Sequence, residues 1–279
     1  MDRRAFLLGA GAVGLAACAK PERDLLEPYD GVDIELRPGV TTSSGPPAET
    51  TAPPSTTTTE PVSPMQALRN SVAVEDQPGL SFVARTKVDV IEVEAERGDG
   101  IAAWTFANPI ESGGQLVFLV DDYDGIDRYR VLLPTRPNGS FGWIRVDDVD
   151  LASHNFAIRT DLDAFRLEVL DHDEVVFTTL TGVARANAPT PRGRYYTTEI
   201  IRPAVPDSVY GAFAYGLSGY SETFTSFNGG PGQLGIHGTN DPDTLGTNVS
   251  AGCIRMHNDD ITRLVEEIKL PVGVPVEVI

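Results

Sequence analysis

A run of threonine, serine and proline limits where this chain of 279 residues can fold. In residues 39–64, 18 of 26 positions are Thr, Ser or Pro. Such a composition offers no apolar face to pack, and its proline pairs favour the extended polyproline II conformation. We therefore expect residues 19–65 to be a disordered linker, with packed structure in residues 66–150 and 151–279.

The first 18 residues are typical of an export signal. Arg3 and Arg4 precede an apolar stretch that ends in Leu-Ala-Ala-Cys at Cys18. This ending resembles the lipobox of bacterial lipoproteins, and the arginine pair resembles a twin-arginine signal. We expect Cys18 to be lipidated and to anchor an extracytoplasmic protein to the cytoplasmic membrane. The alternative is an ordinary or uncleaved signal, and both the twin-arginine and the Sec routes stay open.

Charge and hydropathy exclude two classes of function. The chain has 22 Lys and Arg against 40 Asp and Glu, a net charge of −18, with no basic cluster beyond the first four residues. A surface that follows nucleic acid phosphates needs such a cluster, so no nucleic acid partner is expected. The longest apolar run, residues 5–17, is also shorter than the roughly 20 residues of a membrane-spanning helix, which excludes a multi-pass membrane protein.

Residues 66–150 predict a small β module. Apolar residues alternate with acidic ones at 88–94, and further strands are expected at 115–120 and 129–133. Asn138-Gly139 suits a tight hairpin before a returning strand at 142–144. The segment around this turn resembles the SH3-like stretch that precedes the catalytic domain in many secreted cell-wall enzymes. Wall binding and support of the next domain are both open as its role.

Residues 151–279 predict a mainly β domain with one helix near its end. Strands are expected at 156–159, 164–170, 175–180 and 274–279. Apolar residues at helical spacing between 261 and 268 predict the helix, which Asn258 or Asp259 could cap and which Pro271 ends.

The single cysteine outside the leader lies in a setting that favours reactivity. Cys253 follows Gly252, and Arg255 adds positive charge two residues later. Small residues let a substrate backbone approach and let the amides of Gly252 and Cys253 face a developing oxyanion. A thiol nucleophile needs a base, and His237, flanked by a glycine and sixteen residues upstream, is the candidate.

The motifs around these two residues resemble those of one family. Ile236-His237-Gly238-Thr239 and Ser250-x-Gly252-Cys253-Ile254-Arg255-Met256 resemble the signature of the L,D-transpeptidase catalytic domain, also called the YkuD domain. Upstream, Gly182, the Pro-Thr-Pro element at 189–195 and the segments 210–211 and 217–221 fit the same pattern. The resemblance covers about 125 residues, from Asn155 to Ile279.

The resemblance implies a YkuD-type β-sandwich and a role for each site residue. Cys253 is the nucleophile, His237 is its general base and later acid, and the Gly238 carbonyl orients the imidazole. The oxyanion hole consists of the amides of Gly252 and Cys253, and the expected substrate-binding residues are Ser250, Arg255 and Tyr220. At Ala251 many family members carry a second histidine, so substrate contacts there differ.

The resemblance also implies the reaction. The donor is a peptidoglycan tetrapeptide stem that loses D-Ala, and an amine on a second stem completes a 3→3 cross-link. Neither a cofactor nor a metal is implied, and the protein would face the cell wall. An L,D-carboxypeptidase, with water as acceptor, and a non-catalytic wall-binding lipoprotein are the alternatives. Sortases and NlpC/P60 peptidases are disfavoured, because the order and spacing of their His, Cys and Arg differ.

Overall fold

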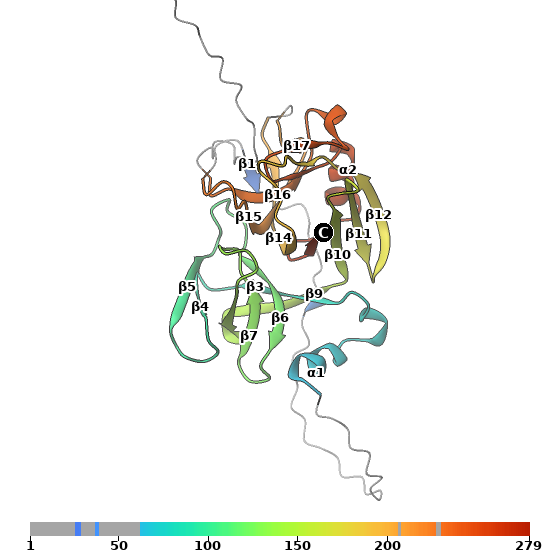
Figure 1. Cartoon of the computed structure of the whole chain (residues 1–279). Coiled ribbons are helices and arrows are strands. Elements are labelled where there is room, and N and C mark those ends of the chain that lie inside the picture. The colour runs from blue at the N-terminus through green and yellow to red at the C-terminus, as the bar shows by residue number, and fades with distance from the viewer. Residues whose placement is uncertain (1–25, 29–36, 39–61, 206–207, 227–229) are drawn as a thin grey trace, which may run out of the picture.

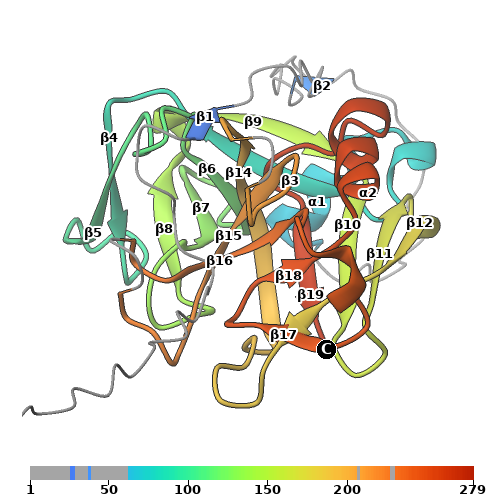
Figure 2. The same ribbon diagram turned by 90° about the horizontal axis from the view of Figure 1, so that it is seen from above.

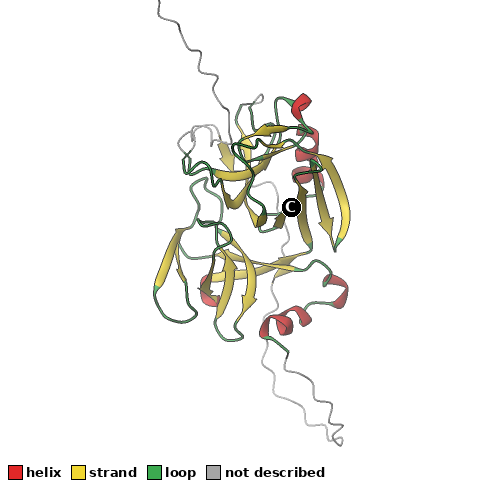
Figure 3. Cartoon of the chain, in the orientation of Figure 1, coloured by secondary structure: helices red, strands yellow, loops and turns green. Residues whose placement is uncertain are grey.

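The computed structural model describes residues 26–28, 37–38, 62–205, 208–226 and 230–279 (Figure 1). The predicted signal, the lipidation site Cys18 and nearly all of the predicted linker lie outside these residues. Strands dominate the rest, with a few short helices (Figure 3). Among the described residues, no helix is both long and apolar enough to cross a membrane.

The upstream module begins with helix α1 (Pro64–Asn70), whose first turn is capped because the Ser63 hydroxyl accepts from the Gln66 amide at 3.1 Å. A 3-10 turn (Val74–Asp76) follows, and another (Val146–Asp148) precedes the last strand. The module's sheet has eight strands, in the spatial order β2 (Arg37–Pro38), β9 (Val149–His154), β3 (Ser81–Thr86), β6 (Val117–Tyr123), β7 (Arg128–Leu132), β8 (Phe141–Arg145), β4 (Val90–Glu94) and β5 (Ala102–Ala107).

The strands expected in this module are confirmed as β4, β6, β7 and β8. The alternation that predicted β4 buries Ile91 and Val93 in the module's core, as period-two patterning requires. The predicted hairpin joins β7 to β8, and Gly139 has φ +79°. Its connection is longer than a two-residue turn, because Leu133 and Ser140 close it with a backbone hydrogen bond.

The second unit is built on a nine-stranded sheet. Its order is β12 (Glu174–Leu180), β11 (Arg166–Asp171), β10 (Phe156–Asp161), β19 (Pro275–Val278), β14 (Gly193–Pro203), β15 (Ala214–Tyr220), β16 (Gln233–His237) and β18 (Ile254–Arg255), with β1 (Leu26–Pro28) on β14. A small parallel pair, β13 (Val183–Ala184) and β17 (Asn248–Ser250), and a 3-10 turn (Pro242–Thr244) lie beside it. The mainly β fold expected for residues 151–279 is confirmed.

The expected helix is present as α2 (Asn258–Thr262), continued by a π-helical turn (Arg263–Glu267). Ile261, Leu264 and Val265 bury one side of it in the core of the large sheet (Figure 2). The prediction that Asn258 or Asp259 caps this helix is wrong. Asn258 is already the first helical residue, and His257 occupies the cap position without a side-chain hydrogen bond. The Asn258 carboxamide is used elsewhere, in the candidate site.

The two units share a small core. Tyr196 of β14 is fully buried against the module residues Val83, Leu119 and Leu132, and its hydroxyl donates to the Val117 carbonyl at 3.1 Å. Burial raises the pKa of Tyr196 well above its ordinary value, so the phenol stays protonated. The contact is therefore apolar, with its one polar end satisfied.

The β7–β8 turn of the module also grips a loop of the second unit. One nitrogen of Arg136, Nη2, donates to three backbone carbonyls, those of Ser221, Phe224 and Pro231, at 3.0, 3.0 and 2.8 Å. The Arg136 guanidinium also lies over the Tyr220 ring, 4.7 Å from its centroid. We call these contacts the Arg136 clamp. It fixes the segment between β15 and β16 to the upstream module.

Replacing Arg136 with alanine is expected to destabilise the chain by about 2 kcal/mol, because three carbonyls, two of them in part-buried hydrogen bonds, lose a charged donor. Arg145→Ala is the matched control, since the Arg145 side chain is 57% exposed and meets Asp147 only at 3.9 Å. Its effect should stay within about 0.5 kcal/mol. Urea denaturation measures both variants, and equal midpoints would contradict the clamp.

Candidate active site

The strand register gives the large sheet two chemically different faces around β14, β15, β16 and β18. Ile200, Tyr215, Ile236 and Ile254 occupy one face, and all four lie in the main core. Side chains alternate between faces along a strand, and directly paired residues share a face. The residues on either side of these four therefore point to the other face, which we call the catalytic face.

His237 and Arg255 lie next to each other on the catalytic face. Strand β18 runs parallel to β16 and pairs Arg255 with His237, while Ala214 of β15 pairs with His237 on its other side. The Arg255 backbone is held in turn by Gly182, through hydrogen bonds of 2.8 and 2.9 Å. The predicted base and the predicted arginine are thus neighbours through main-chain pairing.

Cys253 lies in the next row of the same face. A Cβ built on Gly235 would be 3.8 Å from the Cys253 Sγ. Gly235 pairs with Gly216 of β15, and Gly216 pairs with Glu199 of β14. Two glycines therefore leave the surface beside the sulfur without side chains on the sheet.

His237 is fixed in one tautomer. Its Nδ1 lies 2.6 Å from the Gly238 carbonyl, which can only accept, so Nδ1 carries the proton and Nε2 keeps its lone pair. Burial lowers the pKa of His237 to about 4, with a further lowering by the charge of Arg255 and a partial offset from the Gly238 bond. The imidazole is consequently neutral at neutral pH.

Asn258 holds the loops on both sides of this histidine. Its Oδ1 accepts from the amides of Ala212 and Thr239, at 3.1 Å each. A Cβ on either Gly211 or Gly238 would collide with the same oxygen. These contacts explain the glycine after His237, and they use the side chain that sequence reasoning assigned to a helix cap.

The turn before Cys253 is fixed by two hydroxyls. Ser250 Oγ donates to the Cys253 carbonyl at 2.5 Å and accepts from the Gly252 amide at 3.2 Å. Thr190 Oγ1 donates to the Gly252 carbonyl at 2.7 Å. In a trans peptide the N–H points opposite to the carbonyl, so Thr190 sets the direction of the Cys253 N–H. The Ser250 side chain thus stabilises the turn, and the Gly252 amide donates its hydrogen bond to the Ser250 hydroxyl.

Two arginines converge near His237. The Nε atoms of Arg185 and Arg255 are both buried, and neither has a hydrogen-bond partner among the described residues. Burial lowers the pKa of Arg255, and the charge of Arg185 lowers it further, while Asp241 and Tyr210 oppose the change. The Tyr210 ring lies 5.0 Å from the His237 ring, and its buried hydroxyl also lacks a partner within the described chain. This cluster suits an anion.

Phe224 fills the space beside Ala251. It packs against Ala188 and Ala251, two residues before Cys253, and its own carbonyl is one of the acceptors of the Arg136 clamp. Tyr220, predicted to bind substrate, lies at the boundary with the upstream module, where its hydroxyl donates to the Pro134 carbonyl at 3.0 Å. Both residues belong to the stretch that the module holds.

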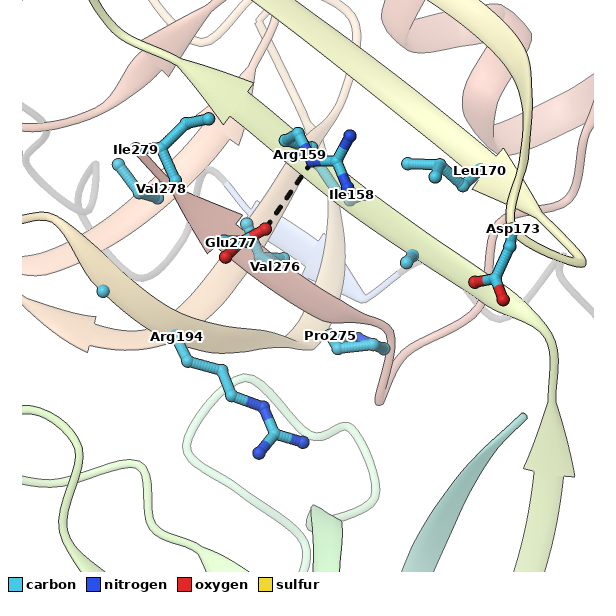
Figure 4. A pocket seen from close by; sticks show the side chains of 12 residues that line it. Ile158, Arg159, Leu170, Asp173, Arg194, Pro275, Val276, Glu277, Val278 and Ile279 are labelled. Atoms are coloured by element: carbon cyan, nitrogen blue, oxygen red, sulfur yellow. Dashed lines mark ion pairs between the residues drawn. The ribbon is translucent and has the colours of Figure 1, made fainter. Parts of the chain in front are cut away.

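A larger surface cavity, of about 500 Å³, lies away from these residues (Figure 4). It is lined by β10, β19 and the start of β14. Both of its arginines are already paired, Arg159 with Glu277 at 3.6 Å and Arg194 with Asp121 at 3.0 Å. Neither Cys253 nor His237 lines it. Over the described part of the chain, no three His, Cys, Asp or Glu side chains gather where they could hold a metal ion.

Comparison with known proteins assigns the second unit. Residues 155–278 match the family described as the L,D-transpeptidase catalytic domain, YkuD. This region is a member of that family. The chain is 33% identical to the YkuD protein of Bacillus licheniformis over 109 residues, which is 39% of this chain and 58% of that protein. It is 35% identical to the YqjB protein of Bacillus subtilis over 117 residues, 38% of this chain and 60% of that one. The chain thus spans less than two thirds of these relatives.

Solved structures of L,D-transpeptidases are also similar to this chain. One from Mycobacterium tuberculosis is 16% identical and has a TM-score of 0.36, and the match covers 52% of this chain and 74% of that one. The catalytic domain of the Enterococcus faecium enzyme is 20% identical with a TM-score of 0.33, over 45% of this chain and 98% of that domain.

Several residues around the L,D-transpeptidase motifs escaped sequence reasoning. Thr190 lay inside a quoted motif but had no assigned role, and Asn258 was assigned a different one. Arg185 and Tyr210 are distant in sequence from Cys253 and carry no spacing signal. Only the fold brings them to the catalytic face.

Two buried histidines, His237 in the L,D-transpeptidase domain and His154 in β9 of the upstream module, predict how the stability of the chain depends on pH. Burial lowers the pKa of both His237 and His154 to about 4 in the folded chain. The unfolded chain binds these protons first, near the ordinary value of about 6.5, so stability is full above that pH and falls as the pH drops through 4. The expected loss is about 3 kcal/mol for each histidine.

Urea unfolding between pH 7 and pH 4 measures this dependence. His154→Gln should reduce the slope of stability against pH, whereas His257→Gln, at an exposed position, should leave it as in the parent chain. A slope that His154→Gln does not alter would contradict the assignment to burial of that imidazole.

Proposed function

We propose that this chain is a peptidoglycan L,D-transpeptidase that forms 3→3 cross-links by acyl transfer through Cys253. The observation that supports this most directly is the placement on the catalytic face. There, His237 presents its Nε2 lone pair and Cys253 lies in the adjacent row, over two glycines. Membership of residues 155–278 in the family adds the expected donor, a tetrapeptide stem.

In the first step the neutral His237 takes the Cys253 proton as Sγ attacks the carbonyl carbon of the third stem residue. A C–S bond forms and the carbonyl oxygen becomes an oxyanion. When the oxyanion collapses, the C–N bond to D-Ala breaks and His237 returns the proton to the leaving amine. The product is a thioester on Cys253 and free D-Ala.

In the second step an amine of another stem attacks the thioester carbonyl. The C–N bond forms, the C–S bond breaks, and the proton lost by nitrogen passes through His237 to Sγ. Water in place of the amine gives a tripeptide, which is the L,D-carboxypeptidase alternative. The acceptor present at the thioester therefore decides between the two products.

The oxyanion is assigned to the Cys253 amide, whose direction Thr190 sets through the Gly252 carbonyl. The Gly252 amide contributes if it is shared between the oxyanion and Ser250, to which it donates at 3.2 Å. A bond of this length is at the weak end of the normal range, so sharing costs little.

The anion-binding cluster of Arg185, Arg255 and Tyr210 supports a donor that carries a carboxylate. The buried Nε atoms of Arg185 and Arg255 without partners among the described residues are costly, and a carboxylate that forms two parallel hydrogen bonds with one guanidinium would offset that cost. A tetrapeptide stem supplies such a group at its terminal D-Ala. Arg255 thus places substrate through its charge, whereas Ser250 acts through the turn.

Export and anchoring are proposed on the sequence alone. The lipobox-like ending at Cys18 and the Thr/Pro-rich segment after it suit a lipoprotein that faces the cell wall from the cytoplasmic membrane. The binding partners are then stem peptides, as donor and acceptor, and the membrane lipid.

The full chain, with a thiol reductant, should convert disaccharide-tetrapeptides into dimers that have lost one D-Ala, as measured by mass spectrometry. Cys253→Ala should abolish the dimers, and His237→Ala should slow them by about 10²–10⁴-fold, because the general base is lost. His257→Gln is the matched control and should keep the parent rate. Tripeptide monomers alone would indicate a carboxypeptidase, and unchanged substrate would indicate a wall-binding protein.

Thr190→Val should lower kcat about 10²-fold, because the valine keeps the shape of threonine but no longer orients the Cys253 amide toward the oxyanion. Thr190→Ser retains the hydroxyl and should restore most of the rate. Initial rates of D-Ala release measure both variants, beside their thermal midpoints. Equal kcat values for the valine and serine variants would show that Thr190 does not position the amide.

A further inference from the structure

A second cavity, of about 240 Å³, lies between the upstream module and the L,D-transpeptidase domain. Its module side is mostly apolar and includes Phe106 and Ile110. Its other side is polar and includes Glu199, Tyr220 and Gln233. The Tyr220 hydroxyl and ring are held by the module, so the cavity depends on how the two units join.

Glu199 is a buried carboxylate without a counterion. Its side chain is among the buried charged groups, with the residue 6% exposed. Its Oε2 has no hydrogen-bond partner, and within the described ranges no Lys, Arg or His forms an ion pair with it. A carboxylate in such a place is costly unless a cation or hydrogen-bond donor joins it.

The position of Glu199 relates it to Cys253. It begins the row that continues through Gly216 and Gly235 to the sulfur. A Cβ on Gly216 would be only 2.8 Å from the Glu199 Oε1, so the carboxylate lies over that glycine. Strands are about 4.8 Å apart, which puts the carboxylate within about 12 Å of the Sγ.

The catalytic face is therefore electrically polarised. Arg185 and Arg255, whose Nε atoms lack partners among the described residues, lie on the His237 side, and the Glu199 carboxylate, whose Oε2 lacks one, lies at the far end of the Cys253 row. A substrate complex that fits both ends has a carboxylate near the arginines and an ammonium group near Glu199. The apolar wall of the cavity suits the methylene groups of a side chain that carries such an ammonium.

We propose that Glu199 is the binding site for the side-chain ammonium of the acceptor stem. The inference rests on the proposed transpeptidase function and names the chemistry by which its second substrate is recognised. The carboxylate captures the acceptor with its side-chain amine protonated, at the end of the Cys253 row, and the amine gives up that proton to solvent before it attacks the thioester. It leaves acylation by the donor unaffected, because the donor carboxylate meets the arginines instead.

Glu199→Gln in the full chain separates the two half-reactions. The rate of D-Ala release into water from a tetrapeptide donor should stay within about twofold of the parent. The KM for a tripeptide acceptor with a free side-chain amine should rise at least about tenfold, the loss expected when a charged hydrogen bond of roughly 1.5 kcal/mol or more is removed. Glu174→Gln, at an exposed position of β12, is the matched control. An unchanged acceptor KM would overturn the proposal.

Binding without turnover gives an independent measurement. The Cys253→Ala chain is titrated calorimetrically with the tripeptide acceptor and with the same peptide acetylated on its side-chain amine. The free amine should bind at least about tenfold more tightly, and adding Glu199→Gln should remove the difference. Equal affinities in the Cys253→Ala chain would overturn the proposal. Failure of the parent chain to release any D-Ala would instead contradict the proposed function.

Discussion

The pairing register of β14, β15, β16 and β18 is the constraint on which the rest of the site depends. One set of alternating residues, such as Tyr215 and Ile236, enters the core. That burial fixes the register, because a slip by one residue would expose the whole apolar set. The other set, which includes His237 and Arg255, must therefore lie on the opposite face of the sheet. Burial of the apolar set thereby fixes the positions of His237 and Arg255, although these two polar side chains are not themselves held by the hydrophobic effect.

The same face concentrates polar groups that the protein leaves unsatisfied. Arg185, Arg255, Tyr210 and Glu199 each have a buried polar atom without a partner among the described residues. Elsewhere in the same domain Thr190 and Tyr195 are bonded, to the Gly252 and Pro191 carbonyls, while the Thr160 and Thr181 hydroxyls also lack a partner among the described residues. The charged side chains of this domain with such an atom, Arg185, Arg255 and Glu199, are the groups that a ligand with complementary charges would satisfy.

The sequence predicted the elements that depend on neighbouring residues, but it did not predict the contacts that the strand register creates between distant residues. The alternation at 88–94, the Asn138-Gly139 turn and the helical spacing at 261–268 all led to the right elements, because each depends on neighbours in sequence. The fold class and the family followed from motifs. Glu199 was missed because its relation to Cys253 passes through two strand pairings and the contact of Gly235 with the sulfur, which no spacing in the chain reveals. The prediction that Asn258 caps the helix was wrong for a related reason, since two amides distant in sequence donate hydrogen bonds to its side chain.

The hydrogen bonds of the Arg136 clamp go only to main-chain atoms of the loop that it holds. At Phe224 and Pro231 this bonding therefore requires a particular side chain only of the module, Arg136, and no more than a carbonyl of the loop. The side chain at Phe224, which packs on Ala251, can therefore be exchanged while the hydrogen bond from Arg136 to the main chain stays in place. The chain thus has a position at which the surface beside Ala251 can change by substitution, without rebuilding the backbone near Cys253.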